Sequence, residues 1–387
     1  MDTFRQHHLF ALLDYYDSET LPIDLVISRY FKLHRSLGSK DRAFIAENIY
    51  GMIRWLSLIE LFCEANSSWE KKWETYQNLD FSTLAEQTSI PEWVRYGFPE
   101  ELYNLIVASH GVELGRAICT ASNYPAPTTV RVNLLKTTRA YLLEKWATDY
   151  QVSPCSLSAT GIIFHKKINF FGLEEFKQGL FEVQDEGSQL IGELMDVAPG
   201  QQVLDYCSGS GGKTLAFAHK MECRGQLYLH DIRSNILQEC KKRLRRAGIQ
   251  NAQVVYPSDA KLKKLKKQMD WVLADVPCSG TGTLRRNPDM KWKFDLEMLK
   301  RLQGEQRTIF EKALSYMKPG GHIVYATCSL LQEENEKQIE HFLKTYQLEI
   351  VGNVFKSVPK EGQMDGFFAA VLKRAPLSSA LNPVSDL

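Results

Sequence analysis

The stretch Val203-Leu204-Asp205-Tyr-Cys207-Ser-Gly-Ser-Gly-Gly-Lys-Thr214 joins a short apolar strand to a glycine-rich turn. Glycines let the backbone turn tightly and approach a ligand, and a helix that follows offers its first N–H groups. A phosphate-binding loop of the type G-x-x-x-x-G-K-[ST] would need glycine at position 207. A dinucleotide-binding G-x-G-x-x-G would need glycine at 214, where threonine stands. The turn therefore fits neither of these two nucleotide-binding patterns.

Acidic residues that end successive predicted strands favour a third ligand, S-adenosylmethionine. Asp205 ends the first strand, Asp231 ends the next, and Ser258-Asp259 follows the third. A carboxylate in the position of Asp231 can hold the ribose hydroxyls of this donor. Strand-end acids are also common as structural caps, so it is their order along the chain that favours a methyltransferase.

The chain from Gln201 onward alternates apolar strands with amphipathic helices. This rhythm is typical of a doubly wound, mostly parallel sheet, whose ligand lies at the carboxyl ends of the strands. The expected strands are 202–206, 226–231, 252–257, 270–277, 322–329 and 367–374, and the expected helices are 213–221, 234–247, 295–317 and 334–345.

Two cysteines follow neighbouring predicted strands, Cys278 in Asp275-Val-Pro-Cys278 and Cys328 in Ala-Thr-Cys328. They could be small buried hydrophobes, which is the usual fate of a free cysteine. They could also serve chemistry, because carbon-5 of cytosine attacks a methyl sulfonium only after a thiolate has added to carbon-6. Asp275 can hydrogen-bond the cytosine ring, and Lys213 can help to activate a thiol. Nitrogen or oxygen methylation needs no such covalent intermediate, so the pair points to a pyrimidine carbon.

The first half of the chain has a different pattern. Residues 1–66 and 91–119 show helical spacing, whereas 130–133, 161–170 and 179–187 read as extended segments around a helix at 138–148. The expected organisation is an all-α domain (1–120), a small α+β segment (121–180), an α/β domain (181–375) and a loose tail (376–387).

Several motifs together resemble the RsmB/Sun (Fmu, Nop2-like) family of RNA cytosine-carbon-5 methyltransferases. The resemblance covers nearly the whole chain, and its most specific part is the pair PCSGTG and TCS. The matching stretches are LDYCSGSGGKT (204–214), Asp231, SDA (258–260), ADVPCSGTGTLRRNPDMKW (274–292), GGHIVYATCSLLQEENE (320–336), PAPTTVRVNLLKT (125–137), FEVQDEGSQLIGELM (181–195), LGSKDRAFIAENIYGMIRW (37–55) and MDGFFAAVLKR (364–374). The cofactor turn departs from the family pattern C-x-A-P-G-G-K, because Gly209-Ser210 replaces Ala-Pro.

The resemblance implies a class I S-adenosylmethionine-dependent methyltransferase with a Rossmann-like, mostly parallel seven-stranded sheet in its catalytic domain (181–375). It also implies that the helical domain in front (1–120) is NusB-like and binds RNA, as does the small α+β segment (121–180). It implies that Cys328 is the nucleophile and that Cys278 assists product release, with Asp275 and Lys213 beside them. Cofactor contacts are expected at Cys207, Ser208, Gly209, Ser210, Gly211, Gly212, Lys213, Asp231, Asp259 and Asp275. RNA contacts are expected at Arg131, Asn133, Arg285, Arg286, Lys291 and Trp292; Arg131 could instead be a solvated strand residue.

The composition of the chain indicates which partners and which cellular compartment to expect. Residues 1–110 contain 10 Lys and Arg against 16 Asp and Glu, whereas residues 241–301 contain 16 Lys and Arg against 6 Asp and Glu. Because the positive charge is confined to one region, we expect contact with RNA to be local. No apolar run is long enough to span a membrane, no metal-ligand spacing is present, and eight cysteines without a leader predict reduced thiols in the cytoplasm. The expected function is 5-methylcytosine formation in small-subunit (16S) ribosomal RNA by a monomer. Transfer RNA as target, a non-catalytic RNA-binding assembly factor and a small-molecule methyltransferase remain alternatives.

Overall fold

The structure is a computed structural model that describes residues 3–85 and 87–375 of the 387-residue chain. The chain divides into two compact units. The first comprises Met1–Ala126, Ser279–Leu299 and Pro359–Glu361, and the second comprises Pro127–Cys278, Lys300–Val358 and Gly362–Leu387. No helix in the described part of the chain combines the length and the apolar character that crossing a membrane requires.

The first unit is helical. Its main core is formed by the apolar faces of its first three helices, which contribute Leu12, Ile27 and Ile49, one from each helix. Its helices are α1 (Thr3–Asp17), α2 (Ile23–Leu33), α3 (Ser39–Arg54), α4 (Leu56–Leu61), α5 (Trp69–Asn78), α6 (Phe81–Ala85), α7 (Glu92–Arg95), α8 (Glu100–His110), α9 (Val112–Ala121) and α16 (Met290–Lys293).

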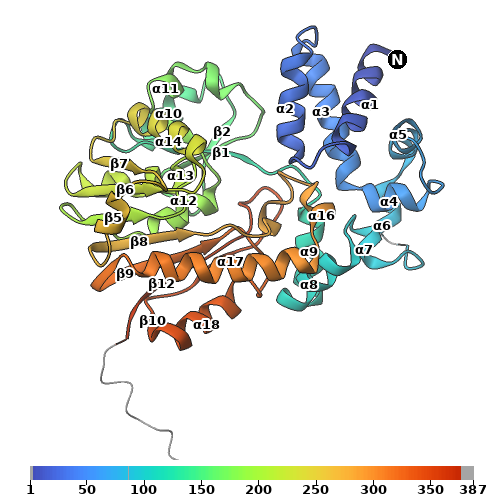
Figure 1. Ribbon diagram of the computed structural model, residues 1–387. Helices are drawn as coiled ribbons and strands as arrows, with labels where there is room; N and C mark the ends of the chain where they lie inside the picture. Colours follow the sequence, from blue (N-terminus) through green and yellow to red (C-terminus); the bar gives the residue numbers. More distant parts are fainter. Residues whose placement is uncertain (1–2, 86, 376–387) are drawn as a thin grey trace, which may run out of the picture. The chain divides into compact units, whose positions relative to one another are not determined.

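The second unit is built on a large, mostly parallel sheet (Figure 1). Its strands run in the order β10-β12-β9-β8-β5-β6-β7, and β11 pairs with β12 as an eighth strand. The strands from β9 to β7 pair in parallel, whereas β12 and β10 are antiparallel. The bounds are β5 (Gln202–Asp205), β6 (Gln226–His230), β7 (Ala252–Val255), β8 (Met269–Asp275), β9 (Met317–Thr327), β10 (Leu348–Ile350), β11 (Phe355–Ser357) and β12 (Phe367–Arg374). The predicted doubly wound α/β fold is confirmed, with one short strand more than the expected seven.

Helices cover both faces of this sheet because successive residues of each strand point to opposite sides. Val203 packs in one core with side chains of α14, and Leu204 packs in another with side chains of α17 and α18. The covering helices are α12 (Glu186–Glu193), α13 (Gly212–Phe217), α14 (Ser234–Ala247), α15 (Lys261–Lys264), α17 (Leu296–Leu314) and α18 (Glu336–Tyr346), with the 3-10 turn η2 (Ala218–Met221). The 3-10 turn η3 (Thr281–Thr283) belongs to the first unit.

A four-stranded antiparallel sheet, ordered β2-β3-β1-β4, belongs to the same unit. Its core joins Val130, Trp146 and Phe181. Its elements are β1 (Thr128–Val132), α10 (Arg139–Trp146), β2 (Val152–Pro154), β3 (Gly161–Phe164), η1 (Phe170–Gly172), α11 (Glu174–Lys177) and β4 (Phe181–Val183). The expected extended segments 161–170 and 179–187 are thus shorter than predicted.

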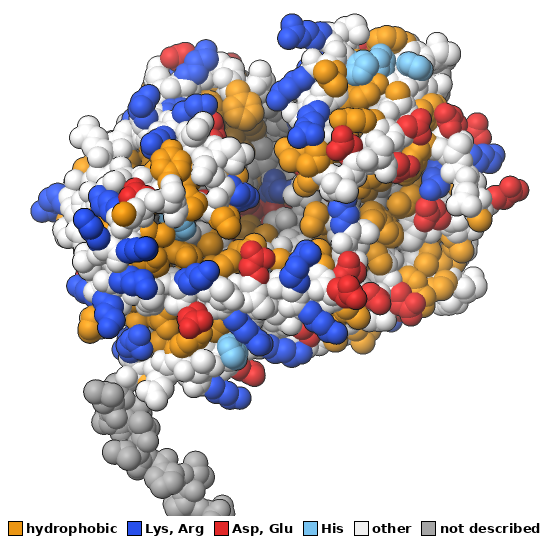
Figure 2. All heavy atoms as spheres, viewed as in Figure 1, with side chains coloured by type: hydrophobic (Ala, Val, Ile, Leu, Met, Phe, Trp, Pro, Cys, Tyr) orange, Lys and Arg blue, Asp and Glu red, His pale blue; other side chains and the backbone are white. Residues whose placement is uncertain are grey.

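The compact units differ from the expected domains. The helical unit extends to Ala126 and takes in residues 279–299, while the small sheet stays with the catalytic part. The expected tail, 376–387, lies outside the described residues. Figure 2 shows many Lys and Arg side chains on the face of the second unit that is in view.

Candidate active site

The glycine turn after β5 is held from two sides. The Ser208 N–H donates to the carbonyl of His230 (2.8 Å), and the Gly209 N–H donates to Asp231 Oδ2 (2.9 Å). Gly211 has φ 82°, a conformation that favours glycine, and it caps α13. The turn is therefore attached to the end of the next strand, β6, where a bound nucleoside would be expected.

Asp231 is a buried carboxylate just beyond β6. Arg233 donates to it from its backbone N–H (2.9 Å), its Nε (2.9 Å) and its Nη2 (3.0 Å). Burial alone would raise the pKa of Asp231, but the hydrogen bonds from Arg233 and Gly209 outweigh it and lower the pKa. Ile232, which the sequence reasoning missed, is 83% exposed beside this carboxylate. In the sequence, its position directly after the acid that ends a predicted strand marks Ile232 as a candidate for contact with a ligand.

Two buried polar atoms at the turn suit a polar cofactor. Asp205 Oδ2 accepts a hydrogen bond from Thr214 Oγ1 (2.6 Å), but Asp205 Oδ1 and Ser208 Oγ have no partner among the described residues. Burial raises the pKa of Asp205 to about 7. Such unmade hydrogen bonds are costly, so groups that a ligand can satisfy are expected at a binding site.

Lys213 and Asp275 form an ion pair at the centre of the site. Lys213, in the first turn of α13, donates to Asp275 Oδ2 at the end of β8 (2.5 Å). Burial opposes the charged form of Lys213, but the charge and hydrogen bond of Asp275 outweigh it and raise the pKa of the lysine. A negative charge on the Cys328 sulfur would raise the pKa of Lys213 in the same direction.

The two predicted catalytic cysteines lie together. Cys278 follows β8, Cys328 follows β9, and their sulfur atoms are 3.4 Å apart. Both side chains are partly exposed, and all eight cysteines of the chain are thiols rather than disulfides. The prediction that these parallel strands bring Cys278 and Cys328 into one place is confirmed.

A buried polar network holds the loops that carry both cysteines. Gln306 Nε2, from α17, donates to the carbonyl of Pro277 (3.0 Å) and to Glu334 Oε1 (2.8 Å). The other oxygen of Glu334 accepts from Ser329 Oγ (2.5 Å), the residue after Cys328. The sequence contains no local signal for this link, because its members come from three separate segments.

Other predicted cofactor residues have simpler surroundings. Asp259 is partly exposed and accepts from the Lys261 N–H (2.8 Å), which is an ordinary turn contact. Cys207 lies in the glycine turn, and burial raises the pKa of its thiol. Neither observation assigns a role.

Arg131 and Asn133, two of the predicted RNA contacts, are buried. Arg131 Nε donates to Gln184 Oε1 (2.7 Å), and burial lowers the pKa of Arg131 to about 10. Asn133 Nδ2 donates to the carbonyls of Gly179 (2.8 Å) and Ala247 (2.9 Å). In this structure both side chains hold segments of the protein together, and neither presents a surface to RNA.

The predicted RNA loop at 285–293 is largely an internal part of the helical unit. Lys291 is fully buried and donates to the carbonyls of Arg54 (3.1 Å) and Gly97 (3.0 Å) and to Asn123 Oδ1 (2.5 Å). Trp292 Nε1 donates to the Ile53 carbonyl (2.8 Å). Arg285 is also buried, whereas Arg286 is partly exposed. The polar groups of Lys291, Trp292 and Arg285 are used inside the helical unit, where Arg285 Nη1 donates to the Lys360 carbonyl (3.0 Å), so all three have a structural role. Direct RNA contact by these residues stays a prediction.

Comparison with known proteins identifies the family. Residues 193–373 match the family model of the 16S rRNA methyltransferase RsmB/F, and residues 98–170 match the ferredoxin-like domain of RsmF/B-like methyltransferases. A ribosomal RNA small subunit methyltransferase B of Vibrio cholerae is 33% identical over 309 residues, which cover 76% of this chain and 69% of the relative. The chain belongs to the RsmB/F family of 16S rRNA methyltransferases.

Further relatives agree with this assignment. A probable methyltransferase of the same name from Synechocystis sp. is 28% identical, covering 76% of this chain and 70% of the relative. The solved structure of a methyltransferase homologue from Pyrococcus horikoshii is 27% identical, with a TM-score of 0.65, over 73% of this chain and 97% of that one. The family assignment agrees with S-adenosylmethionine as the methyl donor, and the turn and acids described above fit this donor. The NusB likeness of the first helices stays a prediction.

Proposed function

We propose that this chain methylates carbon-5 of a cytosine in 16S ribosomal RNA through a covalent bond between Cys328 and carbon-6. The observation that carries the proposal is the 3.4 Å contact of the Cys278 and Cys328 sulfurs at adjoining strand ends. The Lys213–Asp275 pair at the same strand ends supplies charge beside them. The names of the relatives support ribosomal RNA as the substrate.

Each residue has a defined part in the proposed reaction. The Cys328 thiolate forms a bond to carbon-6, and the electrons of the carbon-5/carbon-6 double bond move to carbon-5. Asp275 hydrogen-bonds the cytosine edge and favours this charge build-up, while Lys213 keeps Asp275 in place and stabilises the thiolate. Bound S-adenosylmethionine supplies the electrophilic methyl group that carbon-5 accepts.

Release then requires a base. Removal of the carbon-5 proton returns electrons to the ring, restores the double bond and breaks the sulfur–carbon-6 bond, so that the Cys328 thiolate leaves. Cys278 lies in contact with Cys328, where it can assist this elimination. We assign donor contacts to Cys207, Ser208, Gly209, Ser210, Gly211, Gly212, Lys213, Asp231, Asp259 and Asp275. The exposed side chain of Ile232, next to Asp231, would be available to the adenine of a bound donor.

Bisulfite sequencing tests the proposal directly. Ribosomal and transfer RNA from a strain lacking this chain should show loss of one 5-methylcytosine, in 16S rRNA, that returns when the wild-type chain is supplied. Loss of a transfer RNA site instead would move the same chemistry to another target. Unchanged methylation in both RNA classes would favour the non-catalytic assembly factor and would overturn the proposal.

A further inference from the structure

Backbone hydrogen bonds fix both ends of the cofactor turn, including one from the Gly211 N–H to the Ser208 carbonyl (2.8 Å), but the backbone of its middle residue, Ser210, takes part in none of them. Gly209 has φ 51° and Gly211 has φ 82°, so two of its residues carry no side chain and adopt a conformation that costs backbone entropy to fix. Ser210, between them, stands where the family pattern has proline. Among the described residues the Ser210 N–H has no hydrogen-bond acceptor. The middle of the turn therefore needs to be held by something else.

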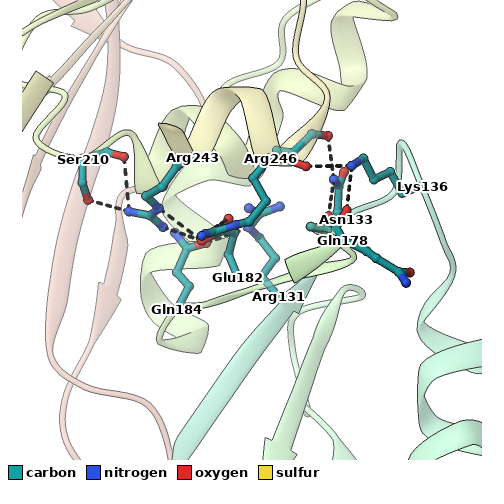
Figure 3. A network of polar contacts seen from close by, with 11 residues as sticks. Arg131, Asn133, Lys136, Gln178, Glu182, Gln184, Ser210, Arg243 and Arg246 are labelled. Atoms are coloured by element: carbon teal, nitrogen blue, oxygen red, sulfur yellow. Dashed lines mark hydrogen bonds and ion pairs between the residues drawn. The ribbon is translucent and has the colours of Figure 1, made fainter. Parts of the chain in front are cut away.

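Arg243 of α14 holds it (Figure 3). Its Nη1 donates to Ser210 Oγ (2.5 Å) and to the Ser210 carbonyl (3.2 Å). The same helix touches the turn once more, because a Cβ on Gly211 would lie 2.9 Å from the Cys240 sulfur. Residues 240 and 243 are one helical turn apart and so share a face of α14.

The guanidinium of Arg243 is itself fixed by Glu182. Its Nε (3.1 Å) and Nη2 (3.0 Å) both donate to Glu182 Oε2, which leaves Nη1 for Ser210. Glu182 lies in β4, and its side chain is only 4% exposed. Charge-assisted hydrogen bonds of this kind are strong and directional, so the position of β4 determines where Nη1 lies.

The helix is also held at its end. Asn133 Nδ2 donates to the Ala247 carbonyl (2.9 Å), and Lys136 Nζ donates to the Arg246 carbonyl (2.7 Å). These contacts satisfy carbonyls that the last turn of α14 would leave unpaired. Figure 3 shows the two sets of contacts lying along the same helix, from Ser210 to Lys136.

From these contacts we infer that Arg243 and Ser210 are positioning residues for the methyl donor, with Glu182 as the anchor. The small antiparallel sheet thereby sets the conformation of the donor-binding turn through α14. A turn that is already ordered pays less entropy when the donor binds, so the contact should raise donor affinity. The inference rests on donor binding at this turn and is independent of the RNA target and of the cysteine chemistry.

The test measures binding of S-adenosylmethionine alone to the full chain by titration calorimetry. Arg243→Met should weaken binding about tenfold, as expected for loss of a charge-assisted hydrogen bond that orders the site. Arg246→Met is the matched control, because Arg246 donates to the same carboxylate, Glu182 Oε1 (2.6 Å), without a described contact to the turn. It should lower the melting temperature but leave the affinity unchanged. Equal weakening by both variants would overturn the inference.

Rescue separates a positioning role from a merely structural one. Proline at position 210 restricts the turn covalently, so Ser210→Pro in the Arg243→Met background should restore most of the lost affinity. In the donor-free protein, Arg243→Met should speed deuterium exchange at residues 208–212, and the double variant should slow it again.

Ser210→Ala removes the hydroxyl that accepts from Arg243 Nη1, so it tests the same contact if Arg243→Met does not fold. An Arg243→Met variant that binds normally, or a double variant without recovery, would contradict the inference; failure of the wild-type chain to bind the donor would instead refute the proposed function.

Discussion

The sulfur atoms of Cys278 and Cys328 lie 3.4 Å apart although 50 residues separate them in the chain. The distance follows from the parallel pairing of β8 with β9, which places Asp275 opposite Ala326 and lets both strands end at the same edge. Because Cys278 and Cys328 follow neighbouring strands at the same edge of the sheet, one pyrimidine ring can contact both thiols.

Replacing Cys328 by alanine should abolish methylation while leaving donor binding intact, because the thiol acts on the base alone. The measurement is methyl transfer from labelled donor to RNA, with donor affinity as the control. Turnover that persists in Cys328→Ala would assign the nucleophile to another residue.

Replacing Cys278 by alanine should trap the protein on its RNA, because addition and methylation proceed but elimination is impaired. The adduct should appear as a band of reduced mobility that survives denaturing electrophoresis, and Cys278→Ala/Cys328→Ala should not form it. A Cys278→Ala variant that releases its product at the normal rate would remove the release role.

Replacing Asp231 by alanine should weaken S-adenosylmethionine binding by roughly 1–3 kcal/mol, the cost of leaving the ribose hydroxyls without their acceptor. Glu222→Gln, an exposed acid in the same unit, is the control and should bind normally. Equal affinities of Asp231→Ala and the wild type by calorimetry would refute the ribose assignment.

Asp205 should make stability fall with rising pH. Burial raises the pKa of Asp205 from 3.8 to about 7, so the folded chain keeps a proton that the unfolded chain loses between these values. The loss of unfolding free energy that Asp205 causes therefore grows from about pH 4 to pH 7 and is constant above pH 7. Asp205→Asn removes it, so the unfolding free energy of Asp205→Asn relative to wild type should rise by about 1–3 kcal/mol between pH 5 and pH 8. A flat difference across this range would show that the carboxyl titrates normally.

Replacing Lys291 by methionine tests whether this lysine serves structure or RNA. Three buried oxygens would lose their donor, so Lys291→Met should destabilise the protein by roughly 2–5 kcal/mol in denaturant unfolding. Arg286→Met, a partly exposed neighbour, should change stability by less. An unchanged stability together with weakened RNA binding would restore the RNA-contact interpretation.

The sheet and the cysteine pair could be predicted because both depend on local pattern. Apolar strands alternating with helices define a parallel sheet, and residues that end such strands share an edge. The RNA loop could not be predicted in this way. A lysine beside a tryptophan in a polar segment resembles a nucleic-acid contact, and only the partners at Arg54, Gly97 and Asn123 reveal that Lys291 is internal. Likewise, Arg131 and Asn133 depend on acceptors brought from distant segments.

The helical unit needs a segment that lies far along the chain, and this has a consequence for biosynthesis. Residues 1–126 are synthesised before the segment 279–299, so the hydrogen bonds of Asp289, Lys291 and Trp292 to Ile23, Arg54 and Ile53 can form only after about 160 more residues have been made. Until the segment that follows Cys278 has been translated, part of the packing surface of the early helices therefore stays uncovered.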